Sequence, residues 1–311
     1  MIRPKSPRLR SRLLLLFPSL LLALPLAGCG TVKGLLIHAV MDEARLPESQ
    51  IERDLSYGSH QRQKLDLFRP AGSGWPLLIF VHGGSWTEGD KALEVGSFEP
   101  YQNIGRFYAA RGVGVALINY RLQPQADWRD QVEDVARAAG WLAGNIAARG
   151  GDPNRIFLSG HSAGAQLISA AAVAPWLGEA RGPAKICGVI AVSGAGFDLA
   201  DQETYRLGAD PAFYAKTFRN GQPDGVWQKE ASASTYLRPG LPPFLLYYGT
   251  KEWPSLQHQN QLFADQLKKA GVQVELVAVP KLRHARMALA ISDEGLLLAE
   301  HILGFVASCP E

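Results

Sequence analysis

The sequence lacks tandem repeats, low-complexity tracts and any linker that would divide the folded part into two domains. It also lacks the HExxH, paired CxxC and P-loop motifs, so neither a cofactor nor a metal is expected. No run of clustered Lys and Arg follows residue 12, which argues against a nucleic-acid partner. What is present is ordinary for a globular protein: 311 residues, 47% hydrophobic and 20% charged, enough to bury a sizeable core. Wholesale disorder is excluded.

The formal net charge of +3 comes from the front of the chain, where basic residues without an acid (Arg3, Lys5, Arg8, Arg10, Arg12) precede an apolar run from Leu13 to Ala27. That run is shorter than the roughly 20 residues that a membrane-spanning helix needs. A charged start, a short apolar run and a small-residue end are typical of a signal peptide. A short transmembrane anchor is the alternative.

The run ends in Leu26-Ala27-Gly28-Cys29, which resembles the bacterial lipobox, in which the cysteine becomes the acylated first residue. Two or more acyl chains give stable membrane anchoring. The sequence therefore predicts a lipoprotein signal peptide over residues 1–28, lipidation at Cys29 and a tether over residues 29–50. The protein is expected in the bacterial cell envelope, exported and held to a membrane through its lipid anchor.

Two further cysteines, Cys187 in an apolar strand-like run and Cys309 near the end of the chain, are expected as separate thiols. Export would permit a disulfide between them, but the sequence cannot show that they are close.

From residue 51 on, strand and helix patterns alternate along a single domain, 51–311. Continuous apolar runs are typical of strands buried on both faces of a parallel sheet, and helical spacing lies between them. We therefore expect an α/β fold with a mostly parallel central sheet and helices on both faces. The expected strands are 63–68, 77–81, 113–119, 156–159, 186–192, 244–248 and 272–279, and the expected helices are 101–111, 130–146, 163–174, 256–270 and 294–306.

This alternation is interrupted at about 194–243, where Gly, Pro and aromatic residues replace any clean period. A long aromatic-rich insertion at the carboxyl edge of such a sheet is a natural small cap over a site. The alternative is a packed surface subdomain without contact to a ligand.

The motif Gly160-His161-Ser162-Ala163-Gly164 follows an expected strand and precedes an expected helix. In this context GxSxG predicts a sharp turn that presents the Ser162 hydroxyl as a nucleophile. A serine needs a base, and in this fold the acid and then the histidine follow it in the chain. His258 and His301 fall within helical patterns, so His284, expected in a loop after strand 272–279, is the predicted base.

The acid that orients the histidine should follow strand 244–248, and Glu252 is the carboxylate found there. Asp198, after the preceding strand, is the competing candidate. A fourth element, His82-Gly83-Gly84-Ser85-Trp86, follows strand 77–81 and can supply backbone N–H donors that, with Ala163, form an oxyanion hole. His82 itself is expected to be a structural hydrogen-bonding residue.

Five segments together resemble the α/β-hydrolase superfamily, and within it the esterase branch of kynurenine formamidases and feruloyl-esterase-like proteins: HGGSWTEGDK (82–91), NYRL (119–122), GDPNR (151–155), GHSAG (160–164) and GTKE (249–252). The resemblance covers about residues 60–305. It implies that Gly84 and Ser85 donate to the oxyanion together with Ala163. Relatives more often have Asp at the position of Glu252.

These observations predict a carboxylesterase that cleaves a small-molecule ester through an acyl-enzyme, with catalytic residues Ser162, Glu252 and His284. One alternative is an arylformamidase acting on N-formylkynurenine-like amides. Another is a non-catalytic binding protein of the cell envelope.

Overall fold

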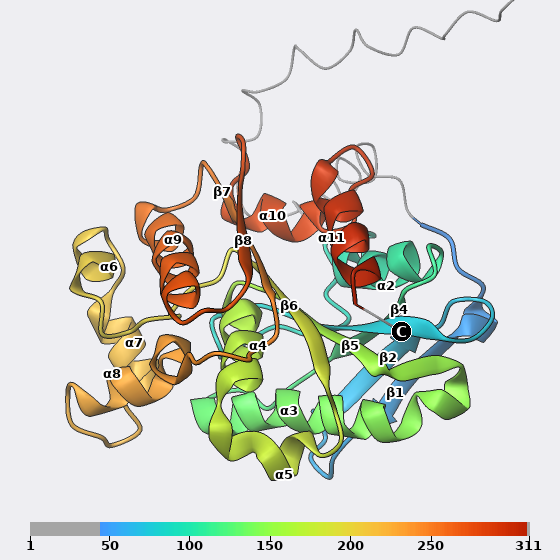
Figure 1. The fold of residues 1–311 in the computed structure, drawn as a ribbon, viewed down its shortest axis with the longest axis horizontal. Helices are drawn as coiled ribbons and strands as arrows, with labels where there is room; N and C mark the ends of the chain where they lie inside the picture. Colours follow the sequence, from blue (N-terminus) through green and yellow to red (C-terminus); the bar gives the residue numbers. More distant parts are fainter. Residues whose placement is uncertain (1–43, 310–311) are drawn as a thin grey trace, which may run out of the picture.

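The computed structural model describes residues 44–309, and their centre is an eight-stranded sheet in the order β1-β2-β4-β3-β5-β6-β7-β8 (Figure 1). β2 pairs antiparallel with β1 and with β4, and every other pairing is parallel. The strands are β1 Ile51–Ser56, β2 Lys64–Phe68, β3 Trp75–Val81, β4 Gly114–Ile118, β5 Gly151–His161, β6 Ile186–Val192, β7 Phe244–Gly249 and β8 Val274–Val279.

Helices cover both faces of this sheet. They are α2 Pro100–Ala109, α3 Trp128–Asn145, α4 Ala163–Val173, α5 Gly178–Arg181, α6 Gln202–Arg206, α7 Pro211–Phe218, α8 Val226–Ala231, α9 Pro254–Lys269, α10 His284–Ala290 and α11 Leu297–Ala307, with short 3₁₀ turns η1 Glu48–Gln50, η2 Ala147–Arg149, η3 Pro175–Leu177 and η4 Ala233–Tyr236. The predicted mostly parallel α/β fold is confirmed. Strand β1 was not expected from the sequence.

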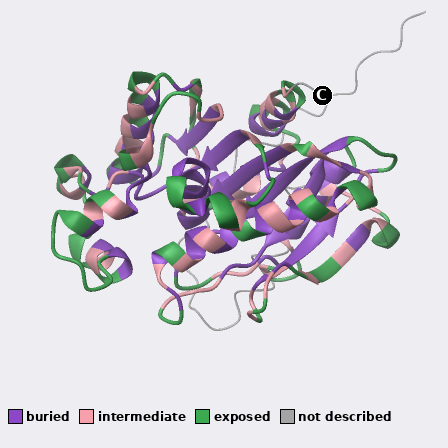
Figure 2. Cartoon of the chain, turned by 60° about the horizontal axis from the view of Figure 1, so that its bottom comes forward, coloured by how far each residue is buried: buried purple, intermediate pink, exposed green. Residues whose placement is uncertain are grey.

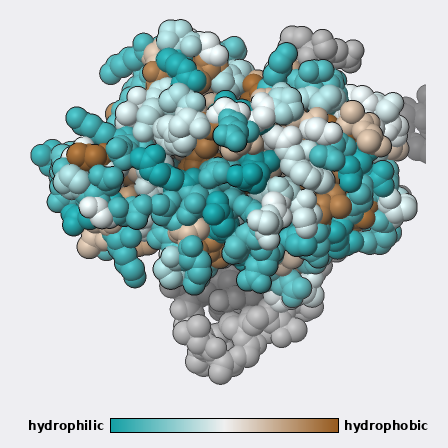
Figure 3. All heavy atoms as spheres, turned by 90° about the horizontal axis from the view of Figure 1, so that it is seen from below, coloured by the Kyte–Doolittle hydropathy of each residue, from teal (hydrophilic) through white to brown (hydrophobic). Residues whose placement is uncertain are grey.

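Alternating side chains of the central strands supply two separate hydrophobic cores. In β3, Leu77, Ile79 and Val81 belong to the core under α3, α4 and α9, whereas Leu78 and Phe80 belong to the core under α2, α10 and α11. Because successive strand residues point to opposite faces, one continuous apolar run fills both cores. Figure 2 shows the buried strands between helices whose outer sides are exposed, and the face in Figure 3 is mostly hydrophilic with small hydrophobic patches.

The segment between β6 and β7 contains α6, α7, α8 and η4, and it lies at one edge of the molecule beside α9 (Figure 1). Side-chain hydrogen bonds join it to that helix: Gln259 donates to the Thr204 hydroxyl at 2.6 Å, and Gln266 donates to Asp198 at 2.6 Å. These bonds hold the insertion in place above the carboxyl ends of the strands.

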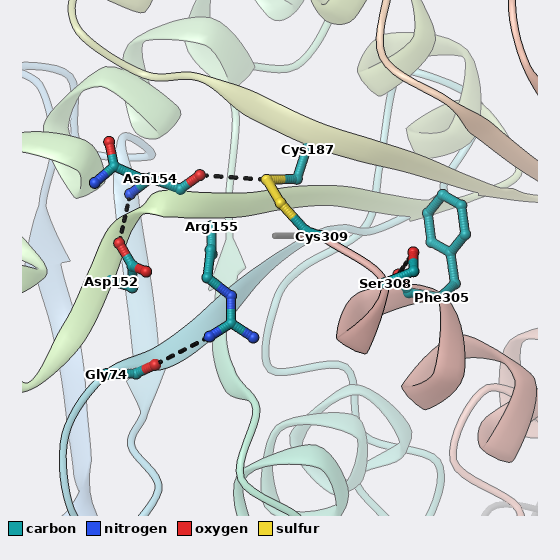
Figure 4. Close-up of a disulfide and its surroundings, with 8 residues drawn as sticks. All are labelled: Gly74, Asp152, Asn154, Arg155, Cys187, Phe305, Ser308 and Cys309. Atoms are coloured by element: carbon teal, nitrogen blue, oxygen red, sulfur yellow. Dashed lines mark hydrogen bonds between the residues drawn. A yellow bond between two sulfur atoms is a disulfide. The ribbon is translucent and has the colours of Figure 1, made fainter. Parts of the chain in front are cut away.

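Cys187 and Cys309 form a disulfide with their Cα atoms 6.0 Å apart (Figure 4). The expectation of separate thiols is therefore wrong. The physical reason is the docking of α11: the Phe305 ring packs edge-on against Phe157 of β5, at 5.9 Å between centroids, and this brings the end of the helix to the start of β6.

The predicted signal peptide, Cys29 and residues 29–43 of the predicted tether lie outside the described residues. Residues 44–50 include η1, and the Ala44 N–H donates to Asn103 of α2 at 3.0 Å. Within residues 44–309 no helix is both long enough and apolar enough to cross a membrane.

Candidate active site

Ser162 lies at a sharp turn between β5 and α4, with φ 57° and ψ −121°. A β-carbon at Gly164 would lie 2.2 Å from the Val81 carbonyl oxygen, and one at Gly160 would lie 2.6 Å from the Gly164 carbonyl carbon. Only glycine allows the turn and the start of α4 to approach β3 this closely. Both glycines of the motif are thus required by packing, and the turn has the geometry of a nucleophile elbow.

The structure brings Ser162, His284 and Glu252 into one hydrogen-bonded chain. Ser162 Oγ lies 2.9 Å from His284 Nε2, and His284 Nδ1 lies 3.1 Å from Glu252 Oε1. The Glu252 side chain is fully buried, and its other oxygen accepts the Gly249 N–H at 3.2 Å. With the ring proton on Nδ1, His284 donates to Glu252 and its Nε2 can accept the serine proton.

His284 is the first residue of α10, which corrects the expectation of a loop position. The return segment 280–283 is tied to the turn after β7, since the Lys251 N–H donates to Leu282 O at 3.0 Å and the Lys281 N–H donates to the Thr250 hydroxyl at 2.9 Å. This tie sets where α10 begins, and with it where the imidazole lies.

The competing acid, Asp198, does not contact His284. One of its oxygens accepts the Ala200 N–H at 3.0 Å and the other accepts Gln266 of α9, so it holds the insertion. His258 of α9 pairs with Asp201 at 2.9 Å, and His301 of α11 lies 2.9 Å from the Tyr247 hydroxyl. Neither histidine belongs to the chain at Ser162, as the sequence indicated.

Three consecutive residues after His82-Gly83 have positive φ: Gly84 at 124°, Ser85 at 51° and Trp86 at 64°. Within the described residues, the structure gives the backbone N–H groups of Gly84, Ser85 and Ala163 no acceptor. Gly84 and Ser85 line the same cavity as Ser162, and Ala163 directly follows it. These three donors are therefore available to an oxyanion.

Hydrogen bonds from the NYRL segment, residues 119–122, stabilise the glycine loop 82–91. Asn119 accepts the Lys91 N–H at 2.7 Å and donates to Asp90 at 2.7 Å, while the Tyr120 hydroxyl donates to the His82 carbonyl at 3.2 Å. The Lys91 ammonium is paired with Asp66 at 2.8 Å. The glycine-loop and NYRL motifs could both be recognised in the sequence, but only the structure shows that they contact each other.

Lys91 is also paired with Asp54 of β1, at 2.9 Å. Burial alone would lower the pKa of Lys91, but the bonds to Asp66 and Asp54 outweigh it and hold that pKa above its ordinary value.

His161, the residue before Ser162, had no role in the sequence interpretation. It is buried, its Nε2 lies 3.1 Å from the His284 carbonyl oxygen, and the two rings are 4.7 Å apart. Burial, aided by the nearby His284, lowers the pKa of His161 to about 3, so the ring is neutral and donates through Nε2.

His82 stacks on Tyr120 at 4.5 Å and lies 2.7 Å from the Gly83 carbonyl oxygen through Nδ1. Burial lowers the pKa of His82 to about 4. This residue supports the glycine loop and does not take part in the chain at Ser162.

Two cavities meet at Ser162 and His284. The larger, about 610 Å³, is mostly apolar and is lined by Gly83, Gly84, Ser85, Glu88, Gly89, Leu93, Val95, Pro100, Tyr101, His161, Ser162, His284, Ala285, Ala288 and Leu289. The smaller, about 320 Å³, includes Asp210, Phe213 and Tyr214 of the insertion. The insertion thus forms one wall of a cavity at the serine.

In this structure a serine lies at a strand-to-helix elbow, and an acid and a histidine follow it at the carboxyl ends of later parallel strands. This arrangement is that of an α/β-hydrolase-type site. Residues 78–288 match the family model described as alpha/beta hydrolase fold, and the chain belongs to that family. Among the described residues, no group of three or more His, Cys, Asp or Glu is placed to hold a metal ion.

The chain is similar to several proteins named as esterases. It is 32% identical to a probable isoprenylcysteine alpha-carbonyl methylesterase of Arabidopsis thaliana (78% of this chain, 58% of the relative). It is 31% identical to the esterase LipQ of Mycobacterium tuberculosis (81% and 61%). The chain thus spans about six-tenths of the length of these relatives. Among solved structures, esterase B of Lactobacillus Rhamnosis shares the fold, with TM-score 0.69, 24% identity and 89% of each chain covered.

Proposed function

We propose that this protein is a carboxylesterase that works through an acyl-enzyme. The observation that carries the proposal is the continuous chain Ser162–His284–Glu252, with contacts of 2.9 and 3.1 Å, at the meeting point of two cavities. Nucleophile, base and orienting acid at hydrogen-bond distance are what acyl transfer by a serine requires. The esterase names of the relatives support the same reaction class.

In the first half of the proposed reaction, Ser162 Oγ attacks the ester carbonyl carbon while His284 Nε2 takes its proton. The negative charge that develops on the carbonyl oxygen is bound by the N–H groups of Gly84, Ser85 and Ala163. Glu252 stabilises the imidazolium. His284 then gives its proton to the departing alkoxide, which leaves as an alcohol.

In the second half, water takes the place of the alcohol. His284 accepts a proton from that water as its oxygen attacks the acyl carbon, and then returns the proton to Ser162 as the acid leaves. In total, one ester and one water are converted to one carboxylic acid and one alcohol, and the enzyme returns to its starting state.

The names of the relatives and the lining of the larger cavity bear on the substrate. Plant relatives are named for an isoprenylcysteine methyl ester, and the larger, mostly apolar cavity with Leu93, Val95 and Leu289 is compatible with a long apolar group. The arylformamidase alternative rests on the HGGSW resemblance. The arylformamidase reaction belongs to tryptophan breakdown, which takes place in the cytosol. A disulfide such as Cys187–Cys309 is instead typical of exported proteins, and this favours the esterase over the arylformamidase.

A substrate panel tests this proposal. We expect p-nitrophenyl esters to be hydrolysed. The rates with S-farnesylcysteine methyl ester and with N-formylkynurenine, compared with those of the p-nitrophenyl esters, test the isoprenylcysteine methylesterase and the arylformamidase alternatives. Labelling of Ser162 by a fluorophosphonate, absent in Ser162→Ala, separates the enzyme from a non-catalytic binding protein. A folded sample that neither hydrolyses an ester nor reacts with the probe would favour the binding protein.

We also propose that the protein is exported and anchored through a lipidated Cys29, with residues 1–28 as the signal peptide. The support is the L-A-G-C sequence after the apolar run, together with the Cys187–Cys309 disulfide, since such bonds persist in oxidising compartments. Radioactive palmitate should label the wild type and not Cys29→Ser. Equal label in both would exclude Cys29 as the acylated residue.

A further inference from the structure

The smaller cavity beside Ser162 combines aromatic rings with one carboxylate. Trp86, Phe213, Tyr214 and Trp253 all line it, together with Asp210 at the start of α7. Apart from His284, Asp210 is the only ionisable group other than tyrosine among its lining residues, which include no Lys or Arg. The cavity therefore has one carboxylate, on the exposed Asp210, and aromatic rings of which Phe213 and Trp253 are the more accessible, since Trp86 and Tyr214 are buried.

The rings of this wall pack closely on one another. Trp86 lies 6.2 Å from Phe213 and 6.2 Å from Tyr214 between ring centroids. Trp253 lies 5.4 Å from the His284 ring and is 63% exposed, so it stands at the rim next to the reacting atoms. The indole N–H of Trp86 donates to Gln166 at 3.1 Å. With its N–H engaged there and only 2% of the residue exposed, Trp86 borders the cavity through a small part of its ring.

Asp210 has no positively charged partner within the described residues. Its Oδ1 accepts the Ala212 N–H at 2.9 Å as the N-cap of α7, and its side chain forms no ion pair with a described Lys, Arg or His. Every other acidic residue of the insertion between β6 and β7 except Asp198 contacts a basic side chain: Glu203 pairs with Arg206, Asp224 with Arg219 and Glu230 with Arg129, and Asp201 is hydrogen-bonded to His258. Asp198 instead binds Gln266.

The larger cavity shows the same charge balance. Apart from the buried, neutral His161, Glu88 and His284 are its only acidic or basic lining residues, and Lys and Arg are absent from its lining as well. A substrate with a second, anionic group would meet no positive side chain in either cavity. A cation, in contrast, gains from a carboxylate and from ring faces, which attract ammonium groups held within about 6 Å.

We propose that the smaller cavity, with Asp210, Trp86, Phe213 and Trp253, binds an ammonium group carried by the ester substrate. This inference rests on the proposed esterase function and deepens it, because it names a cationic ester as the substrate class. It does not depend on which half of the ester carries the charge.

Isosteric ester pairs test the preference directly. For a charge on the alcohol, butyrylcholine is compared with 3,3-dimethylbutyl butyrate. For a charge on the acyl group, the p-nitrophenyl ester of 4-(trimethylammonio)butyrate is compared with that of 5,5-dimethylhexanoate. Each pair exchanges N⁺ for carbon and little else. We expect at least one pair to show a preference of about tenfold or more in kcat/KM for the cation, the scale of a few cation–π and carboxylate contacts.

Asp210→Asn should bring that ratio to about one, because asparagine keeps an N-cap oxygen and removes only the charge. The matched control is Glu203→Gln, which removes one charge from the same insertion at an exposed residue outside the cavity and should keep the wild-type ratio. A ratio near one for both pairs in the wild type would overturn the proposal. So would a preference that survives in Asp210→Asn and is lost in Glu88→Gln, since the cation would then bind in the larger cavity.

A binding measurement separates this inference from the esterase proposal. By titration calorimetry, choline should bind the wild type more tightly than its neutral isostere 3,3-dimethylbutan-1-ol, and this difference should be lost in Asp210→Asn. If no ester is hydrolysed but the difference is found, the esterase proposal fails and the cation site stands. If esters are hydrolysed and the two alcohols bind alike, the cation site alone fails.

Discussion

Replacing Glu252 by glutamine isolates the role of the buried acid, because the side chain keeps its size and loses its charge. In the wild type, Oε1 lies 3.1 Å from His284 Nδ1 and Oε2 accepts the Gly249 N–H. If the new amide keeps its oxygen on the Gly249 N–H, its NH₂ group points toward Nδ1. The imidazole must then carry its proton on Nε2, where it can no longer accept the proton of Ser162.

The size of the expected loss in kcat can be worked out from the distance between Glu252 Oε1 and His284 Nδ1. Two unit charges 3.1 Å apart in an effective dielectric of about 20 interact by about 5 kcal/mol, which is close to ten-thousandfold in rate. The amide dipole recovers part of this if it turns its oxygen to Nδ1. We therefore expect kcat to fall by about a hundredfold to ten-thousandfold.

Turnover of p-nitrophenyl butyrate measures the effect, with circular dichroism and the urea midpoint as checks on folding. The matched control is Asp198→Asn, in the carboxylate that binds Gln266 and Ala200 and lies away from His284. It should change kcat far less. If Glu252→Gln keeps more than about a tenth of kcat while Asp198→Asn loses a hundredfold, the acid has been assigned to the wrong strand.

Ser162→Ala should stay folded and lose about a millionfold in kcat, in practice to background; kcat above a tenth of wild type in a pure sample would exclude the serine mechanism. Burial lowers the pKa of His161 to about 3 and that of His82 to about 4, so only the unfolded chain takes up these protons between pH 6.5 and 4. The free energy of unfolding should fall by about 1.4 kcal/mol per pH unit for each histidine below pH 6, and a constant value by urea titration at pH 7, 6 and 5 would contradict this. Cys309→Ser opens a loop between cysteines 122 residues apart and should cost up to about 5 kcal/mol of unfolding free energy, with dithiothreitol destabilising the wild type but not the variant.

Some features of this protein could be predicted from short patterns in its sequence. The sharp turn at Ser162 depends on glycines two residues away on either side, and these can be recognised without knowing what they touch. The sheet could be anticipated for the same reason, because continuous apolar runs such as 77–81 are typical of strands buried on both faces. Element boundaries were predicted less well: β5 begins at Gly151, several residues before the predicted start, and α10 was expected to be a loop.

Other features depend on which surfaces pack together. Asp198 and Glu252 both follow strands of the same sheet, and the sequence favoured Glu252 as the acid with Asp198 as the competing candidate. The turn after β7 lies against the segment before α10, so Glu252 contacts His284, whereas Asp198 lies against α9. Chain order narrowed the candidates for the acid, and only the structure shows which of the two carboxylates contacts His284.

The sequence by itself determined the type of fold, the elbow at Ser162 and the short set of residues that could accompany it, because these follow from backbone conformation and from periodicities within a few residues. Only the tertiary structure decided the Cys187–Cys309 bond, the contact of His161 with His284, the support of the glycine loop by Asn119 and the aromatic, acidic wall of the smaller cavity. Each of these joins residues far apart in the chain. Such contacts are set by how helices dock on the sheet, and a helix can keep the same apolar pattern while docking in many positions.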